Sequence, residues 1–471
     1  MKFIKMIKWG MVPTLAATMF ACQQQTSEVA YASLKGNVKG EEVLYLKGSG
    51  TSRVVKVTEQ GTFNFDSLTV DSPTMLTLSN KKGMPAIQVY LSPGKELNLQ
   101  LAGDKDWRAA SFIGEEAYLN TLNHEVTVEL QKEFRNAYFA FGKYYNNYEA
   151  FLPKIDSVKK EVYNWLAAKE IEDQQLREMF RERAEYHFAA IHLGYPNNYY
   201  TWYKKEIVPT EDLNKYIEGL KKDDAQLYEL LPEYKSFISE YWKYLKQKEE
   251  NRKGEELILG ELYDLAVANF KSANILESLL IEETRFSLRY QDINLFIEDL
   301  PRFFTLIDNE KVEGEIKADF EDYKRLQKGK PAPIWEAVDQ DGKKYTLSDF
   351  KGKYLYVDFW ATWCAPCVKE IPHMAALEKA YEHNDKIVFV SYSQDEDENA
   401  WKKKLESKNM HGIQLRNPNG GIRDSIIRNK YRISGIPRFM LIDPEGNIVS
   451  VDVPRPSEVE KVHAFLDSVL D

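Results

Sequence analysis

The sequence predicts a multidomain α+β protein with an N-terminal β-sandwich, a central α-helical domain and a C-terminal α/β domain. Three observations support this fold class. Residues 34–106 contain short segments of alternating apolar and polar residues, separated by turn signals. Residues 112–327 carry apolar residues at intervals of three and four, which is the helical period. Within residues 329–471, strand-like apolar runs alternate with helical patterns, which is typical of α/β layers.

Length and charge exclude some classes of protein. A chain of 471 residues is long enough for several domains. The formal net charge of −10 argues against a nucleic-acid-binding protein, which normally carries a basic face. Because there are only three cysteines, no framework of disulfides supports the fold.

Residues 1–21 are predicted to be a signal peptide. Lys2, Lys5 and Lys8 precede a short apolar stretch that ends at Ala21 and is too short for a permanent membrane span. The small residue followed by Cys22 resembles a bacterial lipobox, although Met19 and Phe20 depart from the usual pattern. This resemblance implies lipidation at Cys22 and a periplasm-facing location in the bacterial cell envelope, anchored to the membrane. An ordinary secretory signal is the alternative.

The segment after Cys22 is predicted to be a flexible tether, residues 22–33, followed by the β-sandwich-like domain, residues 34–106. Turn signals such as Asn80-Lys-Lys-Gly83 and Ser92-Pro-Gly94 separate its strands. The domain shows no cluster of titratable or metal-ligating residues, so a docking or spacer role is expected.

The central domain, residues 112–327, is predicted to be helical, with breaks at four prolines and a capped helix start at Thr210. The prolines are Pro153, Pro196, Pro209 and Pro232. Its tyrosines and tryptophans, Trp242 among them, have two interpretations. They either line a peptide-binding groove or fill an amphipathic core with their polar ends at the surface.

The C-terminal domain, residues 329–471, follows a polar, proline-containing linker at 326–333. A hairpin with Asp341-Gly342 at its turn comes first. The later pattern predicts strands over 354–359, 386–393, 438–443 and 447–453, and helices after Cys367 and over 399–409, 421–431 and 457–470.

The stretch Asp358-Phe-Trp-Ala-Thr-Trp-Cys364-Ala-Pro-Cys367 carries the chemistry of this domain. A Cys-x-x-Cys pair where a strand turns into a helix places the first sulfur at unpaired N–H groups and the positive end of the helix dipole. This placement favours the reactive thiolate at Cys364, and Cys367 can then resolve a mixed disulfide. Without a second cysteine pair a zinc site is incomplete, and Val368 replaces the histidine of a haem attachment site. A disulfide with a purely structural role is the alternative interpretation of the cysteine pair.

The same stretch resembles the active site of the thioredoxin superfamily. Asp358 lies six residues before Cys364, where thioredoxins keep a buried carboxylate, and Ile436-Pro437 matches their cis-proline loop. Glu370 matches an acidic residue of the TlpA/ResA-like thiol-disulfide oxidoreductase branch. The resemblance covers residues 329–471 and implies a thioredoxin-like fold for them.

The resemblance implies a role for each site residue. Cys364 is expected to be exposed and to attack the substrate disulfide, and Cys367 completes the exchange. Asp358 is the candidate base for Cys367, with Glu370 as a second proton carrier or an ordinary solvated charge. Substrate contacts are expected from Trp363, Ile436 and Pro437, while Trp360 is as consistent with core packing.

Together these features predict a lipid-anchored thiol-disulfide oxidoreductase that reduces disulfide-bonded exported proteins. The Ala365-Pro366 pair resembles the intervening residues of reducing thioredoxins, so the reductive direction is favoured. No metal, nicotinamide or flavin motif is present, so no cofactor is expected and a thiol-reducing electron donor in the membrane is needed. Two alternatives stay open: a lipid-anchored binding or scaffold protein with a vestigial redox domain, and a thiol peroxidase. Val357 and Ala361 argue against the peroxidase, which has Pro and Thr there.

Overall fold

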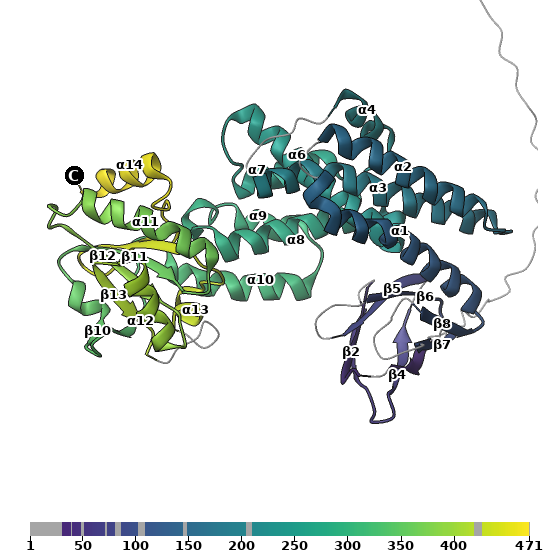
Figure 1. Ribbon diagram of the computed structural model, residues 1–471, viewed down its shortest axis with the longest axis horizontal. Coiled ribbons are helices and arrows are strands. Elements are labelled where there is room, and N and C mark those ends of the chain that lie inside the picture. The colour runs from purple at the N-terminus through teal and green to yellow at the C-terminus, as the bar shows by residue number, and fades with distance from the viewer. Residues whose placement is uncertain are drawn as a thin grey trace, which may run out of the picture. The chain divides into compact units, whose positions relative to one another are not determined.

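The computed structural model describes residues 31–470 except 39, 49–50, 71–72, 81–85, 102–108, 145–147, 204–209 and 419–425. The predicted signal peptide, Cys22 and most of the predicted tether therefore lie outside the described residues. By spatial contact the chain divides into two compact units, residues 1–134 and 135–471, and each is described by itself (Figure 1). Within the described part, the helices lack an apolar stretch long enough to cross a membrane.

The first unit contains two four-stranded sheets, with strand orders β4-β1-β7-β8 and β3-β2-β5-β6. Neighbouring strands are antiparallel except β1 and β7, which run parallel. Alternate residues of both sheets are buried in one common apolar core that includes Leu34, Leu44, Leu76 and Leu97. The strands are β1 (Tyr31–Asn37), β2 (Val43–Gly48), β3 (Thr51–Lys56), β4 (Thr62–Thr69), β5 (Thr74–Asn80), β6 (Ala86–Leu91), β7 (Glu96–Leu101) and β8 (Ala110–Gly114).

Two of these strands differ from the sequence-based expectation. Strand β1 begins at Tyr31, inside the segment predicted to be a tether, and β8 lies beyond the predicted end of the β domain at 106 and extends into the predicted helical domain. Both strands pair with β7, one on each side, so β7 lies in the interior of its sheet. The main-chain hydrogen bonds to β7 therefore extend the β region beyond the predicted bounds.

Helix α1 (Ala117–Tyr144) begins in the first unit, where polar side chains attach it to β6. The side-chain oxygen of Asn120 accepts from the backbone N–H of Tyr90 at 2.7 Å, and its amide donates to the Tyr90 carbonyl at 2.9 Å. Asn120 is fully buried. The Asn120 side-chain amide therefore makes the same two hydrogen bonds to Tyr90 of β6 that the backbone of a neighbouring strand would make.

The helical part of the second unit agrees with the predicted pattern but not with every predicted break. Pro153 lies inside α2 and Pro196 inside α3, so these prolines do not end helices. Thr210 does cap α4, because its side chain accepts from the N–H of Leu213 at 3.2 Å. The helices are α2 (Tyr148–Ala167), α3 (Gln174–Tyr203), α4 (Glu211–Gly219), α5 (Ala225–Leu230), α6 (Pro232–Lys253), α7 (Leu259–Asn269), α8 (Ala273–Tyr290), α9 (Leu300–Leu306) and α10 (Glu310–Tyr323), with 3-10 turns at Ile293–Leu295 and Lys324–Leu326.

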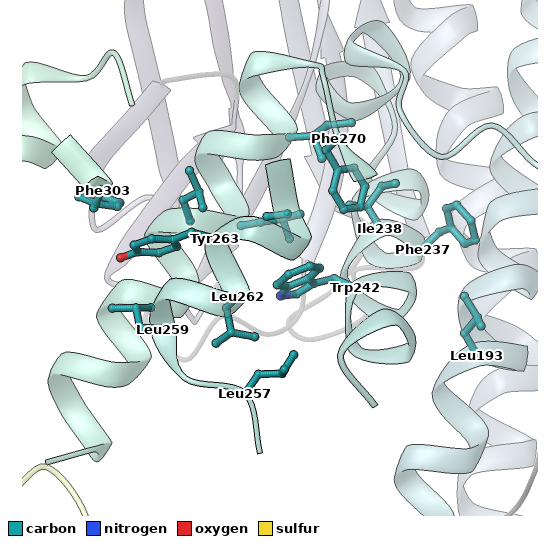
Figure 2. Packing of buried hydrophobic residues seen from close by; sticks show 14 of the residues in the cluster. Leu193, Phe237, Ile238, Trp242, Leu257, Leu259, Leu262, Tyr263, Phe270 and Phe303 are labelled. Atoms are coloured by element: carbon teal, nitrogen blue, oxygen red, sulfur yellow. The ribbon is translucent and has the colours of Figure 1, made fainter. Parts of the chain in front are cut away.

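Aromatic side chains fill the core between these helices. Trp242 of α6 is buried among Leu262 and Phe270, as Figure 2 shows, and its indole N–H donates to Glu283 at 2.6 Å. For Trp242 the core interpretation is therefore correct. The other aromatic residues considered for a groove, at 144–145, 199–200 and 202–203, have side chains outside the described part of the structure.

The C-terminal part of the second unit is built on one seven-stranded sheet with the order β10-β9-β13-β12-β11-β14-β15. Helices α11 and α14 cover one face through Met374, Leu377, Val462 and Leu466. The other face packs on Trp335, Tyr431 and neighbouring residues. The elements are β9 (Glu336–Val338), β10 (Lys344–Thr346), a 3-10 turn (Leu347–Phe350), β11 (Tyr354–Trp360), α11 (Ala365–Ala380), β12 (Ile387–Ser393), α12 (Glu398–Ser407), β13 (Ile413–Arg416), α13 (Ile426–Tyr431), β14 (Arg438–Ile442), β15 (Ile448–Ser450) and α14 (Val459–Leu470).

The segment predicted to be a linker is part of this sheet's edge. The N–H of Gly329 donates to the Ile448 carbonyl at 2.7 Å, and the N–H of Ile448 donates to the Lys330 carbonyl at 2.8 Å. Leu326 is buried in the same core as β11 and β14. The polar composition of the segment therefore reflects its exposed side chains, while its backbone is fixed by hydrogen bonds.

Candidate active site

The cysteine pair lies between the end of the interior strand β11 and the start of α11, as predicted. Cys364 is the N-cap residue of α11, and its Sγ accepts a hydrogen bond from the backbone N–H of Cys367 at 3.2 Å. Pro366 occupies the first turn, where a missing N–H costs nothing. The two cysteines form a disulfide. Once this bond is reduced, the same N–H groups and helix dipole favour a thiolate at Cys364.

The expectation that Cys364 is exposed is wrong for this disulfide form. Cys364 is 5 % exposed and Cys367 is 2 % exposed. Both pack in an apolar cluster with Trp360, Ile371 and Trp401. The carbonyl oxygen of Ile436 also lies 3.6 Å from Sγ of Cys364 and covers it from the opposite loop. Cys364 remains the more accessible of the two sulfur-bearing residues, but by a small margin.

The loop that contains Pro437 faces the disulfide, as the resemblance implied. The Ile436-Pro437 peptide bond is cis. Because β14 starts directly after it and pairs with β11, the loop is held at the same end of the sheet as the cysteines. The structure therefore brings together Cys364 and Ile436, which lie 72 residues apart in the chain.

Asp358 is buried beneath α11. Successive residues of a strand point to opposite faces, and Asp358 shares its face with Tyr356 and Trp360, on the side that α11 covers. It is 4 % exposed, and its Oδ1 has no hydrogen-bond partner among the described residues. Burial, together with the charges of Glu370 and Glu378, raises the pKa of Asp358 to about 8. A carboxyl group in this setting can take up or release a proton near neutral pH.

Glu370 is also buried, so the interpretation of this residue as an ordinary solvated charge is wrong. It is 7 % exposed and accepts two hydrogen bonds from Ser457, from the backbone N–H at 3.0 Å and from the hydroxyl at 2.8 Å. Ser457 lies just before α14. The segment that leads into the last helix therefore holds the Glu370 carboxylate at a fixed position near Asp358.

Glu378 of α11 is a third carboxyl group near the site, after Asp358 and Glu370, and the sequence did not single it out. It lines a cavity of about 250 Å³ together with Ile371, Ser391, His411 and Gln414. Burial raises its pKa to about 7. Ser391 stands directly opposite Asp358 in the pairing of β11 with β12. The cavity between α11 and β12 therefore extends to the strand residue next to Asp358. The sequence does not show this, because α11 and β12 come together only in the folded protein.

Asp395 is another residue that the sequence analysis missed. Its carboxylate accepts from the N–H of Thr362 at 3.0 Å, from the Thr362 hydroxyl at 2.7 Å and from the Ser393 hydroxyl at 2.7 Å. It is 2 % exposed. These bonds fix the turn between β11 and Cys364. A polar Ser-Gln-Asp sequence directly after a buried strand could have indicated Asp395 as a site residue. Loops at the carboxyl ends of neighbouring parallel strands lie close together, so this loop would be expected near the cysteines.

The two tryptophans of the motif have different surroundings. Trp360 is 1 % exposed and packs against Trp401 and the cysteines, so it belongs to the core. Trp363 is 62 % exposed directly beside Cys364. An exposed aromatic side chain next to a reactive sulfur is suited to contact a substrate. Within the described ranges, the His, Cys, Asp and Glu side chains form no cluster of three that could hold a metal ion.

These features together define a thioredoxin-like dithiol–disulfide site: a cysteine pair at a helix N-terminus, a buried carboxyl group beneath it and a proline loop opposite. Known proteins agree with this class. The model of the Redoxin family matches residues 327–466. The thiol-disulfide oxidoreductase ResA of Bacillus cereus is 31 % identical over 150 residues, which cover 32 % of this chain and 83 % of the relative. ResA of Bacillus subtilis is 31 % identical over 144 residues, covering 31 % and 76 %.

Solved structures include the thioredoxin domain of a thiol-disulfide oxidoreductase from Bacteroides vulgatus, which is 29 % identical. The match covers 31 % of this chain and 99 % of that one, with a TM-score of 0.28. The chain belongs to the ResA-like family of thiol-disulfide oxidoreductases through its C-terminal domain, and it is a thiol-disulfide oxidoreductase. The predicted thioredoxin-like fold of this domain is confirmed.

Proposed function

We propose that the protein is a lipid-anchored reductase of the bacterial cell envelope that reduces disulfides of exported proteins. The observation that best supports the proposed mechanism is the buried Asp358 beneath the helix that carries the cysteine pair. Its raised pKa of about 8 is close to that of an ordinary thiol, so the charged fraction of Asp358 near neutral pH can accept the proton of Cys367. The Ala365-Pro366 pair between the cysteines favours the reductive direction.

The reaction begins with the reduced enzyme. The Cys364 thiolate attacks one sulfur of the substrate disulfide, so a mixed disulfide forms and the other substrate sulfur leaves as a thiolate. Cys367 then gives its proton to the Asp358 carboxylate, and its sulfur attacks Sγ of Cys364. The mixed disulfide breaks, and the second substrate thiolate is released. Two electrons have passed to the substrate, and the enzyme holds the Cys364–Cys367 disulfide seen in the structure.

The cycle needs two electrons and two protons to restore the dithiol. A thiol-reducing membrane protein is the proposed donor, and it would reduce Cys364–Cys367 by the reverse exchange. Glu370, held by Ser457, is proposed as a second group that stores or passes the protons of this exchange. Its charge already acts on Asp358, because it contributes to the raised pKa of that residue.

The proposed location rests on the N-terminal sequence. Residues 1–21 would be removed as a signal peptide, Cys22 would carry the lipid, and the protein would face the periplasm. The two sheets of residues 31–114 would form a β-sandwich that serves as a spacer or docking domain between the lipid and the rest of the chain. Replacing Cys22 by alanine should release the protein from membranes, and unchanged fractionation would refute the anchor.

Reduction of insulin by the full chain tests the proposed activity. With dithiothreitol as donor, the wild-type protein should accelerate reduction, and Cys364→Ser should abolish the acceleration. Cys367→Ser should instead trap a mixed disulfide through Cys364, visible by mass spectrometry. Equal rates for the wild-type protein and Cys364→Ser would refute the mechanism.

The reduction potential of the pair decides the direction. A value close to that of thioredoxin, about −270 mV, is expected for a reductase, whereas about −120 mV would indicate an oxidant. Equilibration of the full chain with glutathione and dithiothreitol buffers, read by alkylation of free thiols, gives this number.

A further inference from the structure

We propose that the C-terminal end of α8 carries a docking surface for substrate proteins, made of Phe286 and Tyr290. The surface would receive an apolar side chain located two or three residues from the reacting cysteine of the substrate. The inference rests on the proposed reduction of protein disulfides. It gives the helical region a part in choosing the substrate.

The end of α8 is fixed to the loop that faces the disulfide. The hydroxyl of Ser434 donates to the carbonyl of Arg289 at 3.4 Å, and Nη1 of Arg438 donates to the carbonyl of Tyr290 at 2.9 Å. Arg438 also pairs with Asp452 at 2.9 Å and is only 8 % exposed. Because these bonds involve backbone carbonyls of the helix end, they set the position of the helix whatever side chains it carries.

The outer face of this helix end is aromatic and exposed. Phe286 and Tyr290 are one helical turn apart, their ring centroids are 5.1 Å apart, and they are 51 % and 39 % exposed. The neighbouring Ser287 and Leu288 point inward and are buried. The packing of α8 on its neighbours therefore uses the opposite face and leaves this aromatic pair at the surface. Exposed aromatic groups of this kind are enriched at sites of protein recognition.

The aromatic pair is continuous with the reactive site. A Cβ atom added to Gly435 would lie 3.7 Å from Cε1 of Tyr290, so the ring lies against the loop. The next residue, Ile436, places its carbonyl 3.6 Å from Sγ of Cys364. An extended peptide advances about 3.3 Å per residue. A substrate segment that lies along this loop would therefore reach Tyr290 about two or three residues from its cysteine.

This continuity identifies the occupant as an extended segment of a substrate protein. A small disulfide such as oxidised glutathione ends before it reaches α8, so it would use only the cysteines and the loop. A protein disulfide carries flanking residues, and an apolar one would bury part of Phe286 and Tyr290. The aromatic pair therefore affects protein substrates selectively.

Kinetics of the full chain with matched substrates test the proposal. The substrates are two peptide disulfides with Phe, or with Ser, at positions two and three on both sides of each cysteine, and oxidised glutathione. Phe286→Ser should lower kcat/KM for the Phe peptide about fivefold, and the double variant with Tyr290→Ser should lower it further. The values for the Ser peptide and for glutathione should stay unchanged. Tyr290→Phe should restore the wild-type value.

Ile258→Ser is the matched control, because Ile258 is 48 % exposed in the same helical region but lies between α6 and α7 rather than at the end of α8. Equal losses for the Phe and Ser peptides, or no loss for either, would overturn the docking surface. A change of oligomeric state in Phe286→Ser, with unchanged kinetics, would assign the pair to self-association and also overturn it. If the wild-type protein reduces none of the three substrates, the proposed function fails instead. Phe286 does not take part in fixing the loop, so its variant tests the idea even if Tyr290→Ser fails to fold.

Discussion

The charge of Glu370 acts on Asp358 beneath the cysteine pair, where it helps to raise the pKa of the Asp358 carboxyl group. Asp358 comes from strand β11, whereas Glu370 comes from the second turn of α11 and is held by Ser457. Two carboxyl groups in one buried layer resist being charged together. Asp358 therefore tends to keep its proton near neutral pH, and its charged form can take the proton of Cys367 when the cysteines exchange.

Asp358→Asn should stabilise the protein at neutral pH. The pKa of Asp358 rises from an ordinary value of 3.8 to about 8 on folding, so the folded state binds the proton more tightly than the unfolded state. The contribution of Asp358 to wild-type stability should therefore fall as pH rises from about 4 to 8. The asparagine variant lacks this loss and should be more stable by on the order of 3 kcal/mol at pH 7. Urea unfolding at pH 4, 7 and 9 measures the difference, which should vanish at pH 4.

The rate of the second exchange step should depend on the same proton. Because only the charged form of Asp358 accepts a proton from Cys367, release of the mixed disulfide should speed up between pH 6 and 9. Asp358→Asn should slow this step about 10²-fold or more at pH 7 and flatten its pH profile. Stopped-flow release from a preformed mixed disulfide at Cys364 gives the rate. A wild-type profile retained in the variant would show that another group is the base.

Glu378→Gln should shift that pH profile to lower pH. Glu378 lines the cavity beside Ser391, and its negative charge contributes to the raised pKa of Asp358. Removing the charge makes ionisation of Asp358 easier, so the midpoint should fall by a few tenths of a pH unit. Gly412 lies against the Glu378 carboxyl group, and glutamine keeps nearly the same size there. Glu382→Gln, at an exposed position one turn further along the chain, serves as a charge control and should leave the midpoint unchanged.

Asp395→Ala should destabilise the turn before Cys364. The substitution leaves the N–H and hydroxyl of Thr362 without their buried acceptor, which costs about 1–3 kcal/mol. Asp395→Asn retains one acceptor oxygen and should lose less. Thermal unfolding measures both variants, and insulin reduction should decline in the same order because the turn positions Cys364. Loss of stability without any change in activity would show that the Thr362–Asp395 turn does not position Cys364 for the reaction.

The sequence predicted most of what depends on local pattern. The strand before Cys364 and the helix after it follow from apolar periodicity, whereas the position of Pro437 opposite the pair follows from the resemblance to thioredoxins. The short strands β8 and β13 were missed because their few residues show too little alternation. The sequence predicts helix breaks at Pro153 and Pro196, yet helix packing tolerates both inside long helices.

The parts of the site that were missed depend on contacts between distant segments. The covering of Cys364 by Ile436, the Asp395 bonds to Thr362 and the Glu378 cavity each join residues from separate elements. A single chain read in order gives no distance between them. The same holds for Tyr290, whose place beside Gly435 arises from the packing of α8 on the C-terminal sheet.

The backbone bonds of Gly329 and Lys330 to Ile448 have a practical and a mechanical consequence. A fragment trimmed to start at residue 329 would lose Leu326 and leave an uncovered apolar spot on the sheet. In the intact chain, these hydrogen bonds attach the end of the central helical region to the sheet. A partner protein bound to the last helices of that region would therefore also determine the direction from which a substrate protein approaches the sulfurs of Cys364 and Cys367.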